Sequence, residues 1–312
     1  MRSVICTYCD GDYHYGAAVL INSLYYHGFR GTVWAGYRQT LPPWATPLTP
    51  GNGYQEWIAA EGCVVRFVEL KTTMPLSLYR PTFILQIWNT YEPDLESIFF
   101  FDPNIFNRCS WDFYQRWVKR GIALCGDSWY HVPADHPRRL AWKEFAESQG
   151  FVCERELNHY YNDGFIGIPW RSQSMLLLWQ KLIERAAAEG FLNLTDIYAT
   201  NTTDPYPYFP HDQTALNLTL MLIPDALSTV GPDGMDFLPG GTIMSHAAVS
   251  QAKPWRKPFI RSALQGMAPT LTDKLFWQHT QQPIRVYSTA ALRWKQLTLY
   301  TGAAIGRFIR RS

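Results

Sequence analysis

The sequence predicts an α/β fold in which a mixed sheet is flanked by helices on both faces. Three observations lead to this prediction. Short apolar, β-prone runs alternate with helical patterns along most of the chain. Of its 312 residues, 47% are hydrophobic and 17% are charged, which provides for a large core. The most apolar run, residues 97–101, ends abruptly in polar residues, as expected of a buried strand whose carboxyl end lies at a sheet edge.

The N-terminal part follows the order strand, polar loop, helix, strand. Residues 3–8 are β-prone, Asp10-Gly11-Asp12 is polar, and an apolar helical pattern occupies residues 16–27. Strands are expected over residues 32–37 and 63–70, with a connection rich in Pro and Gly between them. The pattern therefore begins with a βαβ unit.

A helix is expected from Tyr79 to about Thr90, with Pro81 in its first turn, where the missing N–H is harmless. The buried strand 97–101 follows. The later elements are expected in this order: helix 111–120, strand 121–125, covering loop 127–136, helix 138–149, a loop or bulge that leads into a strand over 158–168, helix 172–190, helix 211–221 and strand 243–246. In the segment 158–168, Gly164 and Gly167 would allow the backbone to approach a ligand closely.

Asp102-Pro103-Asn104 is the polar stretch that ends the central strand. A buried carboxylate needs a cap, a partner or a cleft, because burying it alone is costly. Two interpretations remain at this point. The three residues form a turn, for which all three are suited, or they form a ligand site at the carboxyl end of the strand.

Net charge, cysteine spacing and the motifs that are absent argue against several classes of function. A net charge of +2 gives no general argument for nucleic acid as a partner. Cys6 and Cys9 are spaced as a Cys-x-x-Cys pair, but no further metal ligands follow nearby, so ordinary buried thiols are expected. No signal peptide or long apolar span is recognised, which predicts a cytoplasmic location. The fingerprints of serine hydrolases, phosphate loops and dinucleotide-binding domains are absent.

The chain becomes basic after Gln251. Lys253, Arg256, Lys257 and Arg261 are interleaved with aromatic residues, and Arg293, Lys295, Arg307, Arg310 and Arg311 make the tail basic again. Such a tail is typical of peripheral contact with an anionic membrane or of binding to a phosphate-bearing partner. The alternative is a solvated helical face.

Six polar features occur in a fixed order. They are Asp10 after the first strand, Arg80-Pro81, Asp102-Pro103-Asn104, Asn162-Asp163-Gly164, His211-Asp212-Gln213, and His246 followed by Lys253-Pro254-Trp255. In this order they resemble the nucleotide-sugar glycosyltransferases of the GT-A fold, in particular bacterial lipopolysaccharide galactosyltransferases and glycogenin. The resemblance covers roughly residues 2 to 260. It implies a Rossmann-related GT-A-like domain over residues 1–260 and a basic helical extension over residues 261–312.

The resemblance implies a divalent cation, Mn²⁺ or Mg²⁺, bound against the donor diphosphate by Asp102, Asn104 and His246. Asn104 departs from the family pattern because it offers a neutral amide oxygen in place of a carboxylate. It is either a tolerated ligand or the mark of reduced dependence on metal. Lys253 would neutralise the leaving diphosphate. The segment between His246 and Lys253 is two residues longer than in the family, and Ala248 replaces its glycine.

The resemblance also implies a donor-binding set. Thr7, Asp10 and Tyr13 would bind uracil and ribose, while Arg80 would approach the phosphates or hold Asp102. Asn162, Asp163 and Gly164 would face the sugars, and Asp212 and Gln213 would lie beneath the donor sugar. The residues expected to act in catalysis are Asp163, Asp212, Gln213 and Lys253. A carboxylate at residue 212 suits binding of hydroxyls, stabilisation of an oxocarbenium-like centre or proton acceptance.

The function that these residues predict is transfer of a hexose from a nucleotide-diphosphate sugar, most simply a uridine diphosphate sugar, to a hydroxyl acceptor. A glycan, a lipid or a protein would serve as acceptor, and nucleic acid is not expected. One alternative is a weakened sugar-nucleotide-binding protein that acts as a scaffold for a partner transferase. Another is a nucleotidyltransferase, for which the loop after the first strand is a poor phosphate loop.

Overall fold

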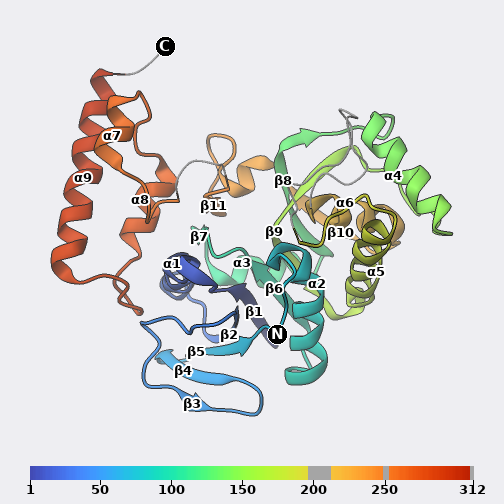
Figure 1. Ribbon diagram of the computed structural model, residues 1–312, viewed down its shortest axis with the longest axis horizontal. Helices are drawn as coiled ribbons and strands as arrows, with labels where there is room; N and C mark the ends of the chain where they lie inside the picture. The colour runs from blue at the N-terminus through green and yellow to red at the C-terminus, as the bar shows by residue number, and fades with distance from the viewer. Residues whose placement is uncertain (196–211, 249–252, 310–312) are drawn as a thin grey trace. The chain divides into compact units, whose positions relative to one another are not determined.

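The computed structural model describes residues 1–195, 212–248 and 253–309. It is an α/β structure with a mixed, nine-stranded sheet in the order β10-β8-β9-β6-β1-β2-β5-β4-β3, flanked by helices, and a two-stranded sheet of β11 and β7 (Figure 1). This architecture confirms the predicted α/β class with a mixed sheet and is compatible with a Rossmann-like fold. No helix of the described residues is both long enough and apolar enough to cross a membrane.

The strands are β1 (Ser3–Tyr8), β2 (Gly31–Tyr37), β3 (Thr49–Pro50), β4 (Gln55–Ala60), β5 (Cys63–Glu69), β6 (Ser97–Phe101), β7 (Ile105–Asn107), β8 (Ile122–His131), β9 (His159–Pro169), β10 (Leu227–Val230) and β11 (Met244–His246). The α-helices are α1 (His14–Tyr26), α2 (Leu76–Gln86), α3 (Trp111–Val118), α4 (Pro137–Ser148), α5 (Ser174–Ala188), α6 (Asp212–Leu222), α7 (Phe259–Leu264), α8 (Leu271–Gln278) and α9 (Thr289–Phe308). Residues 211 and 310–311, which were expected to start a helix and to end the basic tail, lie outside the described residues.

The chain divides into two compact units. The first comprises Met1–Cys6, Leu70–Phe100 and Tyr114–Asp233, and the second comprises Thr7–Glu69, Phe101–Phe113 and Gly234–Ser312.

In the first unit, β6 is the most deeply buried strand. All five of its residues are buried, and Ser3 to Cys6 of β1 pair with it in parallel. A continuous apolar run is what a parallel strand covered on both faces requires. Strand β8 pairs in parallel with β10 and antiparallel with β9, and the register of β8 with β9 shifts at two places. Of the two alternatives expected for this segment, the structure has the bulge, because β9 is a strand from His159 to Pro169 with an irregular register.

In the second unit, β2 and β5 pair in parallel over seven residues. Helix α1 is apolar almost all round and is buried from Gly16 to Leu24. It packs in a core with the C-terminal helices that includes Val19, Phe106, Trp255 and Phe276. The buried Asn22 side chain donates hydrogen bonds to the carbonyl oxygens of His279 (2.6 Å) and Ile284 (2.8 Å), so α1 is fixed to the segment between α8 and α9.

Two local predictions were wrong. Helix α2 begins at Leu76, so Pro81 lies inside the helix and not in its first turn. The burial of apolar residues such as Phe83 and Ile84 outweighs the lost hydrogen bond. Residues 127–131 belong to β8 and not to a covering loop, because β8 continues alongside β9 to the His131–His159 pair.

Gly167 has a packing role in the sheet. A Cβ atom there would lie 3.0 Å from the Phe99 ring and 3.1 Å from the Ala123 Cβ. The absence of a side chain at this position therefore permits close packing in the sheet.

Candidate functional site

Strands β7 and β11 join two distant parts of the sequence in the second unit. His246 pairs with Ile105 in the antiparallel register. Beyond this pair, the Ala247 N–H donates to the Asn104 carbonyl oxygen at 2.9 Å, and the Asn104 amide Nδ2 donates to the Ala247 carbonyl oxygen at 2.8 Å. The pairing brings the polar stretch after β6 beside the residues that follow β11.

Asp102 and His246 face each other in this arrangement. The Asp102 Oδ2 lies 3.7 Å from the His246 Nε2, and the two side chains are 23% and 5% exposed. The Phe237 ring lies 5.8 Å from the imidazole, centroid to centroid. His246 is buried, so it is not an exposed surface histidine.

The donor atoms at this position fit a divalent cation. Two ligands that each bind at about 2.1 Å can be at most about 4.2 Å apart, so the carboxylate and the imidazole can bind one ion. Asn104 adds an amide oxygen in the same loop. The described residues contain no group of three or more His, Cys, Asp or Glu side chains suited to a metal, and the set here is one carboxylate, one imidazole and one amide.

Lys253 completes this group. Its Nζ donates to the Ala247 carbonyl oxygen at 2.5 Å, the same oxygen that accepts from Asn104. Burial lowers the pKa of Lys253, the Asp102 carboxylate opposes that shift, and Arg256 adds to it. The structure therefore brings Asp102, Asn104, His246 and Lys253 together.

The loop after β1 contacts the residues after Lys253. Asp12 accepts a hydrogen bond from the Trp255 indole at 2.9 Å and also pairs with Arg256. Burial raises the pKa of Asp12, but the bonds from Arg256 and Trp255 outweigh it and the net pKa is lowered. The Tyr13 ring packs edge-on against Trp255 with ring centroids 5.6 Å apart. These contacts hold the Lys-Pro-Trp segment against the first loop of the unit.

Gly16 permits a close packing contact beneath the same group. A Cβ atom at this position would lie 2.2 Å from the Pro103 carbonyl oxygen and 2.9 Å from the Trp255 ring. Only glycine lets α1 approach the backbone between Asp102 and Asn104 this closely. Gly16 thus fixes the position of the loop that carries both side chains.

Asp10 and Thr7 lie in the same unit. Asp10 accepts hydrogen bonds from the Arg38 side chain at 3.0 and 2.6 Å and from the Arg38 backbone N–H at 3.0 Å, so its carboxylate is already engaged. The Thr7 side chain is fully buried, and its hydroxyl has no hydrogen-bond partner among the described residues.

In the first unit, Arg80 and Asp163 form a buried ion pair. The distance from Arg80 Nη1 to Asp163 Oδ2 is 2.7 Å, with the side chains 2% and 10% exposed. The same nitrogen also donates to the Asp163 carbonyl oxygen, and the guanidinium lies over the Phe100 ring at 4.6 Å. Arg80 is therefore not a plain surface arginine, and Asp163 is its ion-pair partner.

Asp127 organises the other polar residues of the first unit. Its Oδ2 accepts from Asn162 Nδ2 at 2.7 Å and from Gln213 Nε2 at 3.2 Å. The Gln213 Oε1 in turn accepts from the Asp163 N–H at 3.2 Å. Because each amide is held by a charged or backbone partner, its rotamer is fixed.

Asp212 and Gly164 join this network through the backbone. Asp212 Oδ1 accepts from the Gln213 N–H at 2.8 Å, and the Gly164 N–H donates to Asn162 Oδ1 at 2.9 Å. The predicted residues of the first unit, Arg80, Asn162, Asp163, Gly164, Asp212 and Gln213, thus form one connected group around β9 and the start of α6.

Sequence reasoning missed Asp12, Gly16, Arg38 and Asp127 as functional candidates. For Asp127, the available signal was a polar residue that follows the apolar run 122–125 after a single glycine, much like the signal that marked Asp102. For Asp12 and Arg38, the interaction partners are distant in sequence, and no local sequence pattern indicates these contacts. Cys6 and Cys9 are buried thiols whose pKa values are raised by burial, which makes them poor metal ligands.

Compared with models of known protein families and with curated protein sequences, the chain matches none. The functional assignment therefore depends on the geometry of two groups of residues, the one around Asp102 and His246 and the one around Asp127 and Asp163.

Proposed function

We propose that this chain is a GT-A-type glycosyltransferase that transfers a hexose from a uridine diphosphate sugar to a hydroxyl acceptor. One observation carries the proposal. Asp102 and Asn104 lie with His246 and Lys253 across the β7–β11 pair, although about 140 residues separate the two motifs in the sequence. A turn or an incidental basic loop gives no reason for this convergence.

The residues of the second unit would bind the nucleotide diphosphate. Asp102, His246 and the Asn104 amide oxygen would hold a divalent cation, which when bound neutralises phosphate charge. An imidazole ligand favours manganese over magnesium, because magnesium prefers oxygen ligands alone. Lys253 would pair with a phosphate oxygen as the diphosphate leaves. Tyr13 and Thr7 offer a ring and a buried hydroxyl for the base and ribose.

The residues of the first unit would bind sugar hydroxyls. Asn162 and Gln213 are held by Asp127, and Asp163 is held by Arg80. Side chains that are fixed in this way lose little entropy when they bind a ligand. Asp212 supplies a further carboxylate at the start of α6, suited to a sugar hydroxyl or to the acceptor proton.

Titration calorimetry with uridine diphosphate, with and without manganese, tests the proposal. We expect manganese-dependent binding by the unchanged chain and a loss of more than about tenfold in affinity for Asp102→Ala. The matched control is Asp94→Ala, because Asp94 is 79% exposed and pairs with Arg2 at the surface. The proposal is wrong if no nucleotide binds in either condition, or if both variants bind alike.

A scaffold protein that binds sugar nucleotides without turnover is the second candidate. The observation in its favour is that the Asn104 amide nitrogen is engaged by the Ala247 carbonyl oxygen. This leaves one neutral oxygen for a cation where a carboxylate would offer charge as well. Donor binding without transfer, and without hydrolysis of the donor over long incubation, would favour the scaffold.

A further inference from the structure

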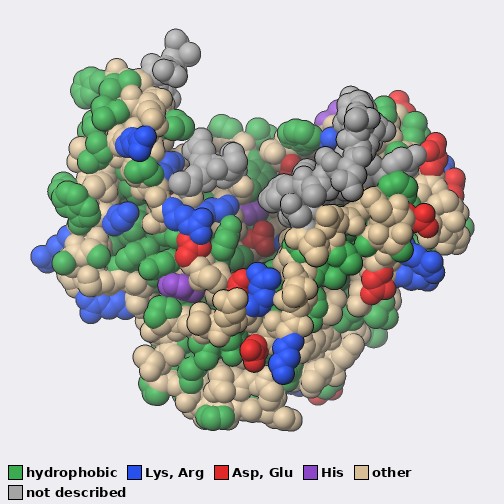
Figure 2. Space-filling view, in the orientation of Figure 1, with side chains coloured by type: hydrophobic (Ala, Val, Ile, Leu, Met, Phe, Trp, Pro, Cys, Tyr) green, Lys and Arg blue, Asp and Glu red, His purple; other side chains and the backbone are tan. Residues whose placement is uncertain are grey.

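Charge is distributed very unevenly along this chain. Residues 253–312 contain eleven of the 28 Lys and Arg residues but only one of the 26 Asp and Glu residues. That one acid, Asp273, is 3% exposed and pairs with Lys257 at 2.7 Å. The described surface from residue 253 to 309 therefore presents cations and no exposed carboxylate side chain, and it complements an anionic partner. Figure 2 shows Lys and Arg side chains over these helices.

The same helices expose large apolar side chains. Trp294, Leu297 and Tyr300 on α9 are 63%, 56% and 67% exposed, and Leu264 at the end of α7 is 58% exposed. Apolar side chains interspersed with cations on a helical surface are characteristic of proteins that bind at the interface of a membrane. Residues 1–252 contain more Asp and Glu than Lys and Arg, whereas in the C-terminal helices the exposed apolar side chains are accompanied by a net positive charge.

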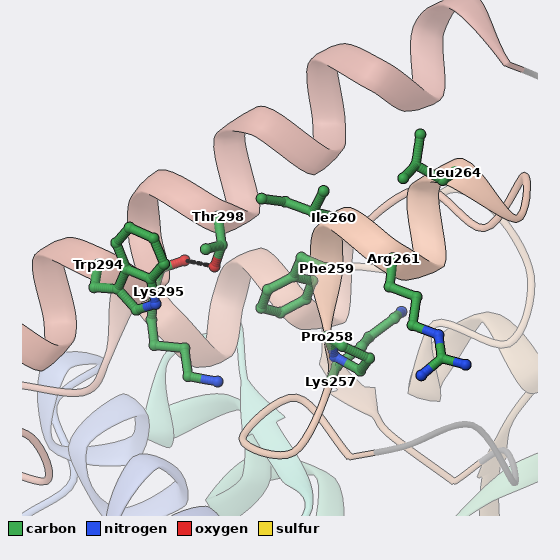
Figure 3. Close-up of a pocket in the computed structure, with 9 residues that line it drawn as sticks. All are labelled: Lys257, Pro258, Phe259, Ile260, Arg261, Leu264, Trp294, Lys295 and Thr298. Atoms are coloured by element: carbon green, nitrogen blue, oxygen red, sulfur yellow. Dashed lines mark hydrogen bonds between the residues drawn. The ribbon is translucent and has the colours of Figure 1, made fainter.

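A groove between α7 and α9 has a volume of about 430 Å³, within the range of about 300–1,000 Å³ that is typical of small-molecule sites. Phe259, Ile260, Leu264 and Trp294 line it, and Figure 3 shows them together with the cations of the site. Phe259 is 2% exposed and belongs to the core. The Thr298 hydroxyl is engaged by the Lys295 carbonyl oxygen at 2.8 Å, so it adds little polarity to the groove.

Two cations at the groove are available to a ligand. Lys257 is engaged by Asp273, whereas among the described residues Arg261 and Lys295 form no ion pair. In Figure 3 the side chains of Lys295 and Arg261 extend toward one side of the groove, and Ile260 and Leu264 lie toward the other. The groove therefore has an apolar part and a cationic part.

We propose that this groove binds an anionic membrane lipid, with part of an acyl chain against Ile260, Leu264 and Trp294 and the phosphate against Arg261 and Lys295. The interaction would hold the chain at a membrane surface by a specific site on α7 and α9 and not by general attraction to its basic tail. The proposal is independent of glycosyl transfer, because none of these residues belongs to the nucleotide or sugar groups.

Flotation of the full chain with lipid vesicles tests the proposal. Vesicles of phosphatidylcholine are compared with vesicles that contain equal amounts of phosphatidylcholine and phosphatidylglycerol. We expect binding to the anionic vesicles alone. The double variant Arg261→Gln and Lys295→Gln should reduce partitioning by roughly thirtyfold, at about fivefold for each cation near the surface. Leu264→Asp should abolish binding.

Matched controls separate the groove from general electrostatics. Lys181→Gln with Arg185→Gln removes the same charge from exposed positions on α5, and Leu177→Asp changes a leucine of α5 that is 59% exposed. These variants should bind vesicles like the unchanged chain. Equal losses in the two double variants would overturn the proposal, since they would show attraction by net charge.

Three other outcomes would also overturn it. The first is failure to bind anionic vesicles. The second is full displacement by inorganic phosphate or glycerol phosphate, which would indicate a site for the phosphate alone. The third is a dimer in solution that Leu264→Asp dissociates, which would assign the groove to a second copy of the chain. Uridine diphosphate binding, measured on the same variants, should be unchanged. Its absence in the parent chain would count against the proposed function and not against the lipid site.

Discussion

Replacement of Gly16 by alanine tests how the loop between Asp102 and Asn104 is held. The new Cβ would lie 2.2 Å from the Pro103 carbonyl oxygen, whereas ordinary contact begins at 3.4 Å, so α1 or the loop must move by about 1 Å. Overpacking of this kind costs about 1–3 kcal/mol. The better helix propensity of alanine returns about 1 kcal/mol. The free energy of unfolding should therefore fall by about 0–2 kcal/mol, and the protein should stay folded.

The effect of Gly16→Ala on binding should be larger than its effect on stability. A displacement of about 1 Å in a binding or catalytic loop can reduce function by about a hundredfold. We expect the affinity for uridine diphosphate with manganese, measured by calorimetry, to fall by at least about tenfold. Gly302→Ala is the control, because its Cβ would lie 2.8 Å from the Phe259 carbonyl oxygen in the C-terminal helices. Equal nucleotide affinity in Gly16→Ala and the parent chain would refute this account of the loop.

Three further predictions concern charge and burial. Burial lowers the pKa of His279 from 6.5 to about 4, so the unfolded chain binds the proton more tightly than the folded chain. The free energy of unfolding should therefore fall by about 2–4 kcal/mol as pH decreases from 6.5 to 4. His279→Gln should reduce the pH dependence of the unfolding midpoint over this range, and an unchanged pH profile would contradict the assignment. Lys257→Met leaves the Asp273 carboxylate buried without its cation. The free energy of unfolding, measured with denaturant, should therefore fall by about 3–5 kcal/mol. A decrease below about 1 kcal/mol would show that water or another group replaces the cation. Asn104→Asp should tighten manganese binding in calorimetry, because a carboxylate replaces the neutral oxygen. Weaker or equal binding would show that residue 104 serves only to hold Ala247.

The parts of the fold that sequence predicted are those with strong local patterns. Strand β6 is an apolar run with every residue buried, and α5 has a clear helical period over Ser174–Ala188. Strand β4 was not predicted, because Gln55–Ala60 is only half-buried beside β5 and lacks the alternation of a covered strand. The length of β8 was missed for a related reason, since its end beyond Cys125 pairs irregularly with β9.

The candidate site was predictable only in part. The meeting of Asp102 with His246 was inferred from the order of motifs, since nothing within either segment indicates that β7 and β11 pair. The bonds from Trp255 and Arg256 to Asp12 and from Asn162 and Gln213 to Asp127 depend on side chains that are distant in sequence. Tertiary contacts of this kind leave no periodicity to detect, which is why Asp12 and Asp127 were missed.

The central claim is that Asp102 and His246 hold a cation against a nucleotide diphosphate. A crystal structure of the chain grown with uridine diphosphate and manganese, with anomalous diffraction recorded for the metal, tests it most directly. The account predicts an anomalous peak about 2.1–2.2 Å from Asp102 Oδ2 and His246 Nε2, with a phosphate oxygen as a further ligand. Bound nucleotide with no peak between these two side chains, or a peak elsewhere in the chain, would contradict it.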